Sequence, residues 1–195
     1  MPRFSAFALL FQALLLTGCT VMPVSSMIAL SKVDAMTSDL SRLRIALATP
    51  QALQPKPGGV HMDVVVSYGG QPPEKKLIRL EETATAADLV GLPTADKPGQ
   101  QTHVFKLSQA GIAELTQIRQ NASAAKAEKK KGSLSMGVSA KEFCLAAPLP
   151  QGPLYTTTWM LTSETLAYVE LARNYDLRSD DTIAAGLKDV APCAP

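Results

Sequence analysis

The sequence predicts an α+β fold that is mainly β: an antiparallel sheet or small β-sandwich with one amphipathic helix, at about residues 108–131, packed on it. Three observations support this prediction. Apolar and polar residues alternate over several short runs, which is typical of strands with one buried face. Turn residues, mostly glycine and proline, separate these runs. One proline-free segment has apolar residues at three- and four-residue steps, which is the helical period.

An apolar run precedes the predicted domain. Residues 1–3 carry one positive charge, at Arg3, and residues 4–16 are apolar apart from Ser5 and Gln12. A helix of these 13 residues spans about 20 Å, whereas the hydrocarbon core of a bilayer is roughly 30 Å thick. The run is therefore too short for a membrane-spanning helix and is typical of a signal peptide.

The run ends at Leu16-Thr17-Gly18-Cys19, which places a branched apolar residue and two small residues before a cysteine. This motif resembles the lipobox of bacterial lipoprotein precursors. The resemblance implies that residues 1–18 are a signal peptide and that acyl chains on Cys19 anchor the mature chain to a lipid bilayer of the cell envelope. An ordinary secretory signal peptide and a buried N-terminal helix are the alternatives.

The residue after the lipidated cysteine bears on localisation. In enteric bacteria, an aspartate at this position tends to retain lipoproteins at the inner membrane, and here the residue is Thr20. The resemblance therefore favours the outer membrane, facing the periplasm, over the inner membrane.

Composition bounds the rest of the chain. Residues 19–40 contain Pro23 and several serines and threonines, and we predict a lipidated N-terminus and a tether there. Residues 41–195 are predicted to form a single globular β-rich domain, because the chain is 46% hydrophobic and 18% charged. Removing Arg3 lowers the formal net charge from +2 to +1, so no global field favours nucleic acid as a partner.

The first predicted strand alternates apolar Leu43, Ile45 and Leu47 with Arg42 and Arg44, which indicates one buried and one basic face. A Thr-Pro pair at residues 49–50 ends it. Further alternating runs predict strands at residues 60–68, 76–82, 102–107, 133–138, 156–161 and 166–173. Residues 69–73 form a turn between the first two of these runs, and the last two are expected to pair as a hairpin.

A long connection, residues 83–101, separates two of the strands and contains the apolar residues Leu89, Val90 and Leu92. Connections of this length are usually functional, disordered or a sign of a missed element. Two interpretations of these apolar residues are open: they dock on the core of their own domain, or they form an exposed loop that binds a partner.

The predicted helix has a narrow apolar stripe, which indicates a helix lying on a sheet rather than one buried on all sides. Ser108 suits its N-cap, and Gly132 suits its end. The stripe consists of Ile112, Leu115, Ile118, Ala122 and Ala125.

Four lysines gather at the C-terminal end of this helix, where positive charge suits the helix dipole: Lys126, Lys129, Lys130 and Lys131. They form either a solvated helix end or a contact with an anionic surface. That surface is an anionic phospholipid, a lipopolysaccharide or an acidic partner.

The lipobox resemblance also bears on how the remaining cysteines pair. With Cys19 assigned to lipid, Cys144 and Cys193 remain, and an oxidising compartment favours one disulfide between them. Closing a loop of about 50 residues stabilises a fold by roughly 4 kcal/mol in the chain-entropy model. The alternative is a reactive Cys144, which has no histidine near it in the sequence.

No pattern in the sequence predicts an enzyme, a metal site or a cofactor. His61 and His103 do not fall in a metal-ligand spacing. Ser123 and Lys126 match the spacing of serine acyl-transfer enzymes, but the serine lies late in an exposed helix and the accompanying motifs are missing. Ser139 is not in a nucleophile-elbow motif, and no nucleotide-binding glycine loop occurs.

Two functional hypotheses remain. The first is a non-enzymatic, periplasm-facing lipoprotein that acts as an assembly or adaptor module and binds an envelope protein. The second is a small-ligand or lipid-binding domain with a pocket between helix and sheet. An apolar cavity of several hundred cubic ångströms is the feature that favours the second hypothesis.

Overall fold

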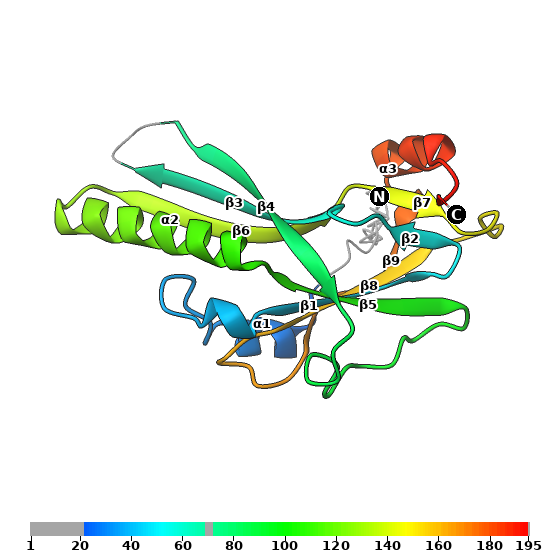
Figure 1. The fold of residues 1–195 in the computed structure, drawn as a ribbon, viewed down its shortest axis with the longest axis horizontal. Helices are drawn as coiled ribbons and strands as arrows, with labels where there is room; N and C mark the ends of the chain where they lie inside the picture. Colours follow the sequence, from blue (N-terminus) through cyan, green and yellow to red (C-terminus); the bar gives the residue numbers. More distant parts are fainter. Residues whose placement is uncertain (1–21, 69–71, 195) are drawn as a thin grey trace, which may run out of the picture.

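The computed structural model describes residues 22–68 and 72–194 (Figure 1). The predicted signal peptide, Cys19 and the centre of the turn at residues 69–73 lie outside the described residues. The predicted fold class is confirmed: the fold is α+β, mainly β, with an antiparallel sheet of seven strands as its body. The predicted helix is present as α2 (Gln109–Ala127) and packs on this sheet.

The seven strands lie in the order β6-β3-β4-β5-β1-β8-β9. They are β1 (Arg44–Pro50), β3 (Val60–Tyr68), β4 (Glu74–Thr83), β5 (Gln100–Leu107), β6 (Gly132–Ala140), β8 (Tyr155–Leu161) and β9 (Val169–Asp176). Each strand that the alternating runs predict is present, and β8 and β9 pair as the expected hairpin. Two short strands that the patterns miss, β2 (Leu53–Pro55) and β7 (Phe143–Leu145), pair with each other in a second sheet.

The prediction of a basic face on the first strand is wrong. Strand β1 lies in the middle of the sheet between β5 and β8, and every residue from Ile45 to Pro50 is buried. Ala46 and Ala48 point to the face where a basic surface was expected, and both are fully buried. A strand that is covered on both faces has no solvent face on which to place charge.

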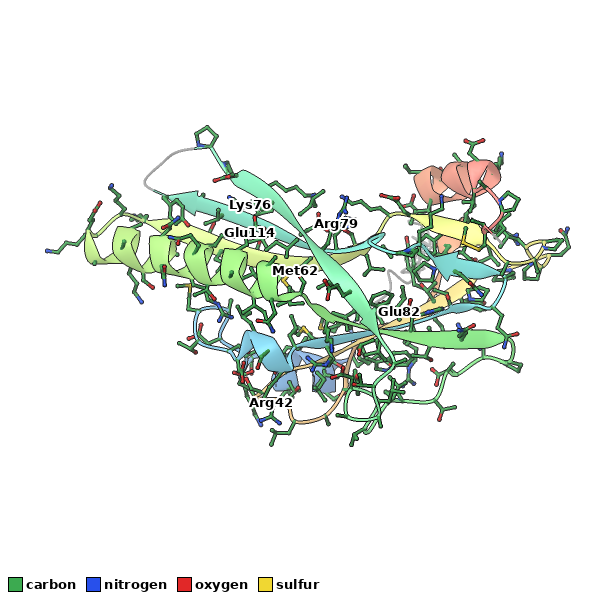
Figure 2. All side chains as sticks on the ribbon, viewed as in Figure 1. Arg42, Met62, Lys76, Arg79, Glu82 and Glu114 are labelled. Atoms are coloured by element: carbon green, nitrogen blue, oxygen red, sulfur yellow. A yellow bond between two sulfur atoms is a disulfide. The ribbon has the colours of Figure 1, made fainter. Side chains whose placement is uncertain are left out.

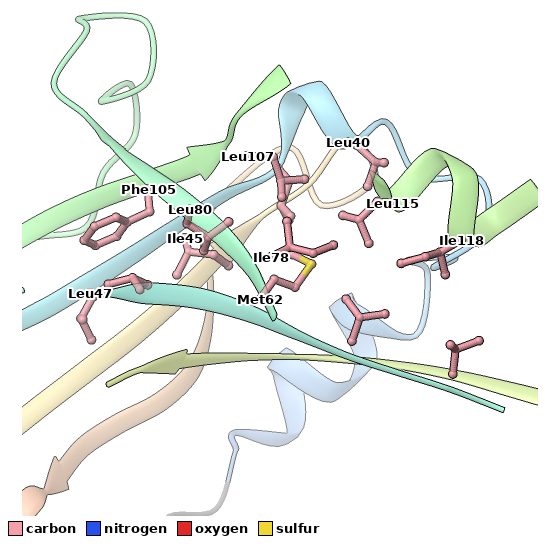
Figure 3. Close-up of a cluster of buried hydrophobic side chains, with 14 residues drawn as sticks. Leu40, Ile45, Leu47, Met62, Ile78, Leu80, Phe105, Leu107, Leu115 and Ile118 are labelled. Atoms are coloured by element: carbon pink, nitrogen blue, oxygen red, sulfur yellow. The ribbon is translucent and has the colours of Figure 1, made fainter. Parts of the chain in front are cut away.

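Two apolar clusters cover the two faces of the sheet. The larger cluster gathers side chains from β1, β3, β4, β5 and α2, and Figure 3 shows Met62 and Ile78 among the strand residues that meet Leu115 and Ile118 of α2. The smaller cluster lies on the opposite face around Trp159, and Leu92 of the β4–β5 connection packs against it. The connection therefore acts as a cover for the second face.

Helix α2 begins as predicted and ends earlier. The Ser108 hydroxyl caps it by accepting a hydrogen bond from the Gly111 amide (3.0 Å). At the other end, Lys129 adopts a left-handed φ of 59°, and the amides of Lys129 and Lys130 donate to the last helical carbonyls. Gly132, predicted as the stop, is instead the first residue of β6. The position suits glycine because a Cβ there would lie 2.6 Å from the Ser67 carbonyl oxygen of the neighbouring β3.

The segment predicted as a tether is folded where the structure describes it. Residues 24–30 form helix α1 (Val24–Leu30), which packs on β9, and Leu40 lies in the larger core cluster. A helix of seven residues is too short to form by intrinsic propensity, so contacts with the sheet hold it. This explains why composition alone predicts an irregular segment there.

The predicted disulfide between Cys144 and Cys193 is present, with a sulfur–sulfur distance of 2.05 Å. It fastens the C-terminal tail beside β7, where the Cys193 amide donates a hydrogen bond to the Leu145 carbonyl (2.9 Å). The short helix α3 (Asp181–Gly186), which the sequence patterns miss, lies between β9 and this tail.

Candidate ligand-binding groove

The sheet is curled, so that its two edge strands, β6 and β9, line the same two hollows. One hollow has a volume of about 410 Å³ and the other about 560 Å³. Val138 of β6 lines both, so the hollows adjoin along this strand. We call the two hollows together the edge groove.

The 410 Å³ hollow is mainly apolar and rich in methionine. The chain before β1 forms one wall, and strands β3, β6, β8 and β9 form the other. Four of the seven methionines of the chain line it: Met22, Met62, Met136 and Met160. Figure 2 shows Met62 projecting from β3 near the centre of the molecule. Methionine side chains are flexible and polarisable, so such a wall adapts to ligands of different shape.

Among the described residues, Arg119 is the cation that lines this hollow, and Asp39, whose carboxylate accepts hydrogen bonds from Ser41, is the anion. Its Nη1 donates a hydrogen bond to the Ser38 carbonyl oxygen (2.7 Å), while Nε and Nη2 are buried and have no partner among the described residues. Burial lowers the pKa of the guanidinium, although the carboxylates of Asp34, Glu164 and Asp39 oppose this shift. The group stays charged, because arginine does not lose its proton in proteins.

The neighbouring carboxylate of Glu164 is occupied by other donors. It accepts hydrogen bonds from the hydroxyls of Ser38 and Ser163, both at 2.8 Å. Burial alone raises the pKa of Glu164, but these bonds and one from Thr162 outweigh it and lower the pKa to about 2. Glu164 therefore fastens the N-terminal segment at Ser38, and Arg119 keeps free N–H groups.

The 560 Å³ hollow extends the groove toward the C-terminal end of the fold. Buried Ile45, Leu53 and Val60 lie among its lining residues, together with Phe143 of β7 and Ile183 of α3. Its polar lining includes hydroxyl groups, among them those of Thr156, Thr158 and Tyr175. Lys141 is the charged residue of this lining, and its Nζ lies 3.7 Å from Oδ1 of Asp63. The other lining residues are uncharged, so this part of the groove suits a largely apolar molecule.

Sequence patterns missed Arg119, although one signal was present. Arg119 stands four residues after Leu115, which is the spacing of the apolar stripe of α2. A cation at a stripe position of a helix that packs on a sheet indicates a polar partner or a ligand there. The strands that line the groove gave no such signal, because their residues meet only after the sheet curls.

The four lysines of the cluster do not line the edge groove. Lys126, Lys129, Lys130 and Lys131 are all exposed, and Lys130 pairs with Glu128 at 2.6 Å. Lys126 and Lys130 border a third hollow of about 480 Å³ at this end of α2, which Tyr68 also lines and which adjoins the 410 Å³ hollow at Ala35.

The apolar residues of the β4–β5 connection were expected either to dock on the core or to form an exposed partner loop, and the structure shows some of each. Leu92 packs on the second face of the sheet, whereas Leu89 and Val90 are exposed. Between them and the sheet lies Asp88, whose carboxylate is buried. The connection is thus held in place with two apolar side chains directed to solvent.

Two polar pairs and the metal-ligating residue types complete the survey of the described residues. The Nδ1 atom of His103 lies 2.7 Å from Oε1 of Glu82, but its Nε2 is buried and bonds to no nucleophile. The Ser139 hydroxyl donates a hydrogen bond to Asp63, and Lys75 forms an ion pair with the same carboxylate. Burial raises the pKa of Asp63, but these two partners help to outweigh it, and the pKa is lowered. A carboxylate with a lowered pKa is a weak base. Within residues 22–68 and 72–194, no group of three His, Cys, Asp or Glu side chains is placed to hold a metal ion.

The comparison with known proteins adds no family. No protein-family model, no curated protein and no solved structure matches this chain. None of the helices in the described part of the chain is long and apolar enough to span a bilayer.

Proposed function

We propose that this protein is a lipid-anchored, non-enzymatic protein of the bacterial cell envelope that binds an apolar, chain-like ligand in the edge groove. The ligand class is an acyl chain with an anionic head group, and Arg119 binds the head group. The observation that carries the proposal is Arg119 itself, a charged side chain with buried, unpartnered N–H groups in the wall of a mainly apolar hollow.

The size of the groove supports this ligand class. Pockets for small molecules usually enclose about 300–1,000 Å³ and have apolar walls with a few polar groups. The two hollows, at about 410 and 560 Å³, fall in this range, and they adjoin at Val138. A long, narrow ligand fits two adjoining hollows better than a compact one does.

The chemistry of Arg119 supports an anionic head group. A buried N–H group without a partner costs free energy, and a carboxylate or phosphate oxygen removes that cost. Arginine binds such oxygens through two N–H groups at once, and Nε and Nη2 are adjacent N–H groups of the kind that this geometry requires.

The membrane anchor is the second part of the proposal. Acyl chains on Cys19 hold the domain at the envelope, with the outer membrane facing the periplasm as the favoured site. We expect Cys19→Ser to abolish labelling with radioactive palmitate and to release the protein from membranes. Unchanged labelling contradicts the anchor without bearing on the groove.

A binding experiment tests the groove. The mature chain with Cys19→Ser, which has no acyl chain of its own, is titrated with palmitate in competition with a fluorescent fatty acid. We expect Arg119→Met to weaken palmitate binding by about 10- to 100-fold, since a hydrogen bond to a charged group contributes about 1.5–3 kcal/mol. Lys126→Met, on the exposed side of the same helix, is the matched control and leaves the affinity unchanged.

A second variant tests the apolar wall independently of charge. Leu171→Trp places a bulky side chain in the 410 Å³ hollow from the edge strand β9, and Leu77→Trp places it on an exposed position of β4. We expect only Leu171→Trp to abolish binding. Equal palmitate affinity in all the variants, or no palmitate binding by the parent chain, rules out this function.

The adaptor function expected from the sequence is the second candidate. One observation favours it: the four lysines stand exposed at one end of α2, and Lys126 and Lys130 border a hollow of about 480 Å³ that is not part of the edge groove. Crosslinking in membranes followed by purification tests it, with Lys126, Lys129, Lys130 and Lys131 changed to glutamate. A partner that is lost from this variant and kept by Arg119→Met supports an adaptor.

A further inference from the structure

Helix α1 exposes its apolar side chains and buries a polar one. Val24, Met27 and Ile28 are exposed by 56–70%, while Ser26 is buried against β9. These three residues have the spacing of one helix face. A surface helix of a soluble domain normally has the opposite orientation, so the outer face of α1 lacks the partner that its composition requires.

Two neighbouring loops continue this apolar surface. Tyr168 lines a hollow together with Ser26 and Ala29 of α1, and its hydroxyl donates a hydrogen bond to the Asp88 carbonyl oxygen (3.0 Å). The β8–β9 turn and the β4–β5 connection therefore meet next to α1. Figure 1 shows the blue helix, the orange turn and the green connection on the same lower side of the molecule.

The exposed apolar side chains of the described residues concentrate at this place. Seven large apolar side chains are exposed among all the described residues, and six of them belong to these three segments. We call the six the α1 patch: Val24, Met27, Ile28, Leu89, Val90 and Leu166. Leu166 has a left-handed φ of 55°, a conformation that strains a leucine. Core packing does not explain an exposed leucine at this position.

We propose that the α1 patch lies on the lipid bilayer and sets the orientation of the domain on the membrane. The length of chain before α1 identifies the bilayer as the occupant. Val24 is five residues from Cys19, and an extended chain of this length spans at most about 18 Å. Acyl chains on Cys19 therefore keep α1 within this distance of the membrane; this step rests on the proposed anchor.

The charge distribution agrees with a membrane contact. Residues 24–30, 89–92 and 165–169 contain no charged side chain, so their contact with lipid removes no charge from water. Exposed Lys32 and Arg42 lie close by in the chain, as do Asp34 and Asp39, and Figure 2 shows Arg42 on the same lower side. The two signs balance, and we expect the contact not to depend on anionic lipid.

Spin labels on the acylated protein test the orientation. A single cysteine replaces Met27, Val90 or Leu166. Leu77→Cys on β4 is the control, because Leu77 is the large apolar side chain that is exposed outside the patch in the described part of the chain. Cys144 and Cys193 do not react because they are bonded to each other. The measurement is the ratio of collisions with dissolved oxygen to collisions with a water-soluble nickel complex. In phosphatidylethanolamine–phosphatidylglycerol vesicles, we expect this ratio to be several-fold higher for the three patch labels than for the control label.

The outcomes separate the patch from the other proposals. If the protein sediments with the vesicles but its patch labels are as accessible to nickel as the control label, the membrane contact is overturned and the anchor stands. Patch labels that are shielded in solution without vesicles show a second copy of the chain on the patch, which also overturns it. Palmitate binding by the groove is measured separately and is expected to be the same in Met27→Cys and the parent chain.

Discussion

At the scale of single residues, Asp88 shows how one buried carboxylate holds a long connection on the sheet. Its two oxygens accept from Nε of Arg44 (2.6 Å), Nζ of Lys106 (3.0 Å) and the hydroxyls of Thr83 (2.6 Å) and Thr85 (2.8 Å). The hydrogen bond from Thr83, together with those from the other three partners, outweighs burial and holds the pKa of Asp88 well below its usual range. The carboxylate is therefore charged and fully paired.

Removing this carboxylate should be costly. We expect Asp88→Ala to lower the free energy of unfolding by about 3 kcal/mol, because it leaves Arg44 and Lys106 without their shared partner in a half-buried site. Urea unfolding followed by circular dichroism measures the change. Asp96→Ala in the same connection is the control: its exposed pair with Arg173, at 3.6 Å, should contribute less than about 1 kcal/mol. Equal effects contradict the role of Asp88.

Glu164 predicts a specific response to acid. Its pKa is lowered from 4.5 to about 2 in the folded chain, so its contribution to stability is present above pH 4.5 and is lost as the pH falls toward 2. We expect the parent chain to be more stable than Glu164→Gln at pH 6, and this difference to shrink between pH 4.5 and 2. Unfolding by urea across this range measures it. A constant difference shows that Glu164 acts through packing and not through its charge.

At the scale of elements, the end of α2 shows two positions with opposite requirements. Lys129 carries a left-handed φ without being glycine, and Gly132 is a glycine because β3 approaches closely. We expect Lys129→Gly to stabilise the fold by about 0.5–1 kcal/mol by removing the strain of a side chain in this conformation. Gly132→Ala should destabilise it, since the new Cβ meets the Ser67 carbonyl. Thermal unfolding measures both, and a stabilising Gly132→Ala contradicts the assignment.

The C-terminal tail depends on its covalent link. It contacts β7 through the Cys144–Cys193 bond and hydrogen bonds on both sides of Leu145. With a sequence separation of 49 between the cysteines, we expect the double change to serine to lower the free energy of unfolding by up to roughly 4 kcal/mol. Unfolding curves of this variant and of the parent chain, with and without a reductant, measure the difference. Parent stability that a reductant does not change contradicts the prediction.

At the scale of the whole molecule, the sequence predicted what depends on local patterns. The alternation in β3 and the three- and four-residue spacing in α2 were sufficient to place these elements, and the cysteine count was sufficient to pair Cys144 with Cys193. Helices α1 and α3 were missed because they are too short to show a period and are held by tertiary contacts. The face of β1 was assigned wrongly because the cover over Ala46 and Ala48 comes from a distant connection.

The edge groove was outside the reach of such patterns for the same reason. Val138 of β6 and Leu171 of β9 line one hollow only because the sheet curls, since the two strands do not pair with each other. Strand order and curl are properties of the complete sheet. Local alternation identifies which side chains are buried, but it does not identify which edge strands share a hollow.

A ligand bound between the two edge strands of the sheet should slow hydrogen exchange in those edge strands. Strands β6 and β9 each have one paired neighbour, so their amides exchange with solvent faster than those of central β1 and β5. We expect saturating palmitate to slow hydrogen exchange in β6 and β9 and to leave β1 and β5 unchanged, because the ligand holds the two edges in place. Hydrogen–deuterium exchange with mass spectrometry measures this, with Leu171→Trp as the control that shows no ligand effect. Protection at the lysine-rich end of α2 instead places the ligand in the hollow beside Tyr68 and contradicts the groove.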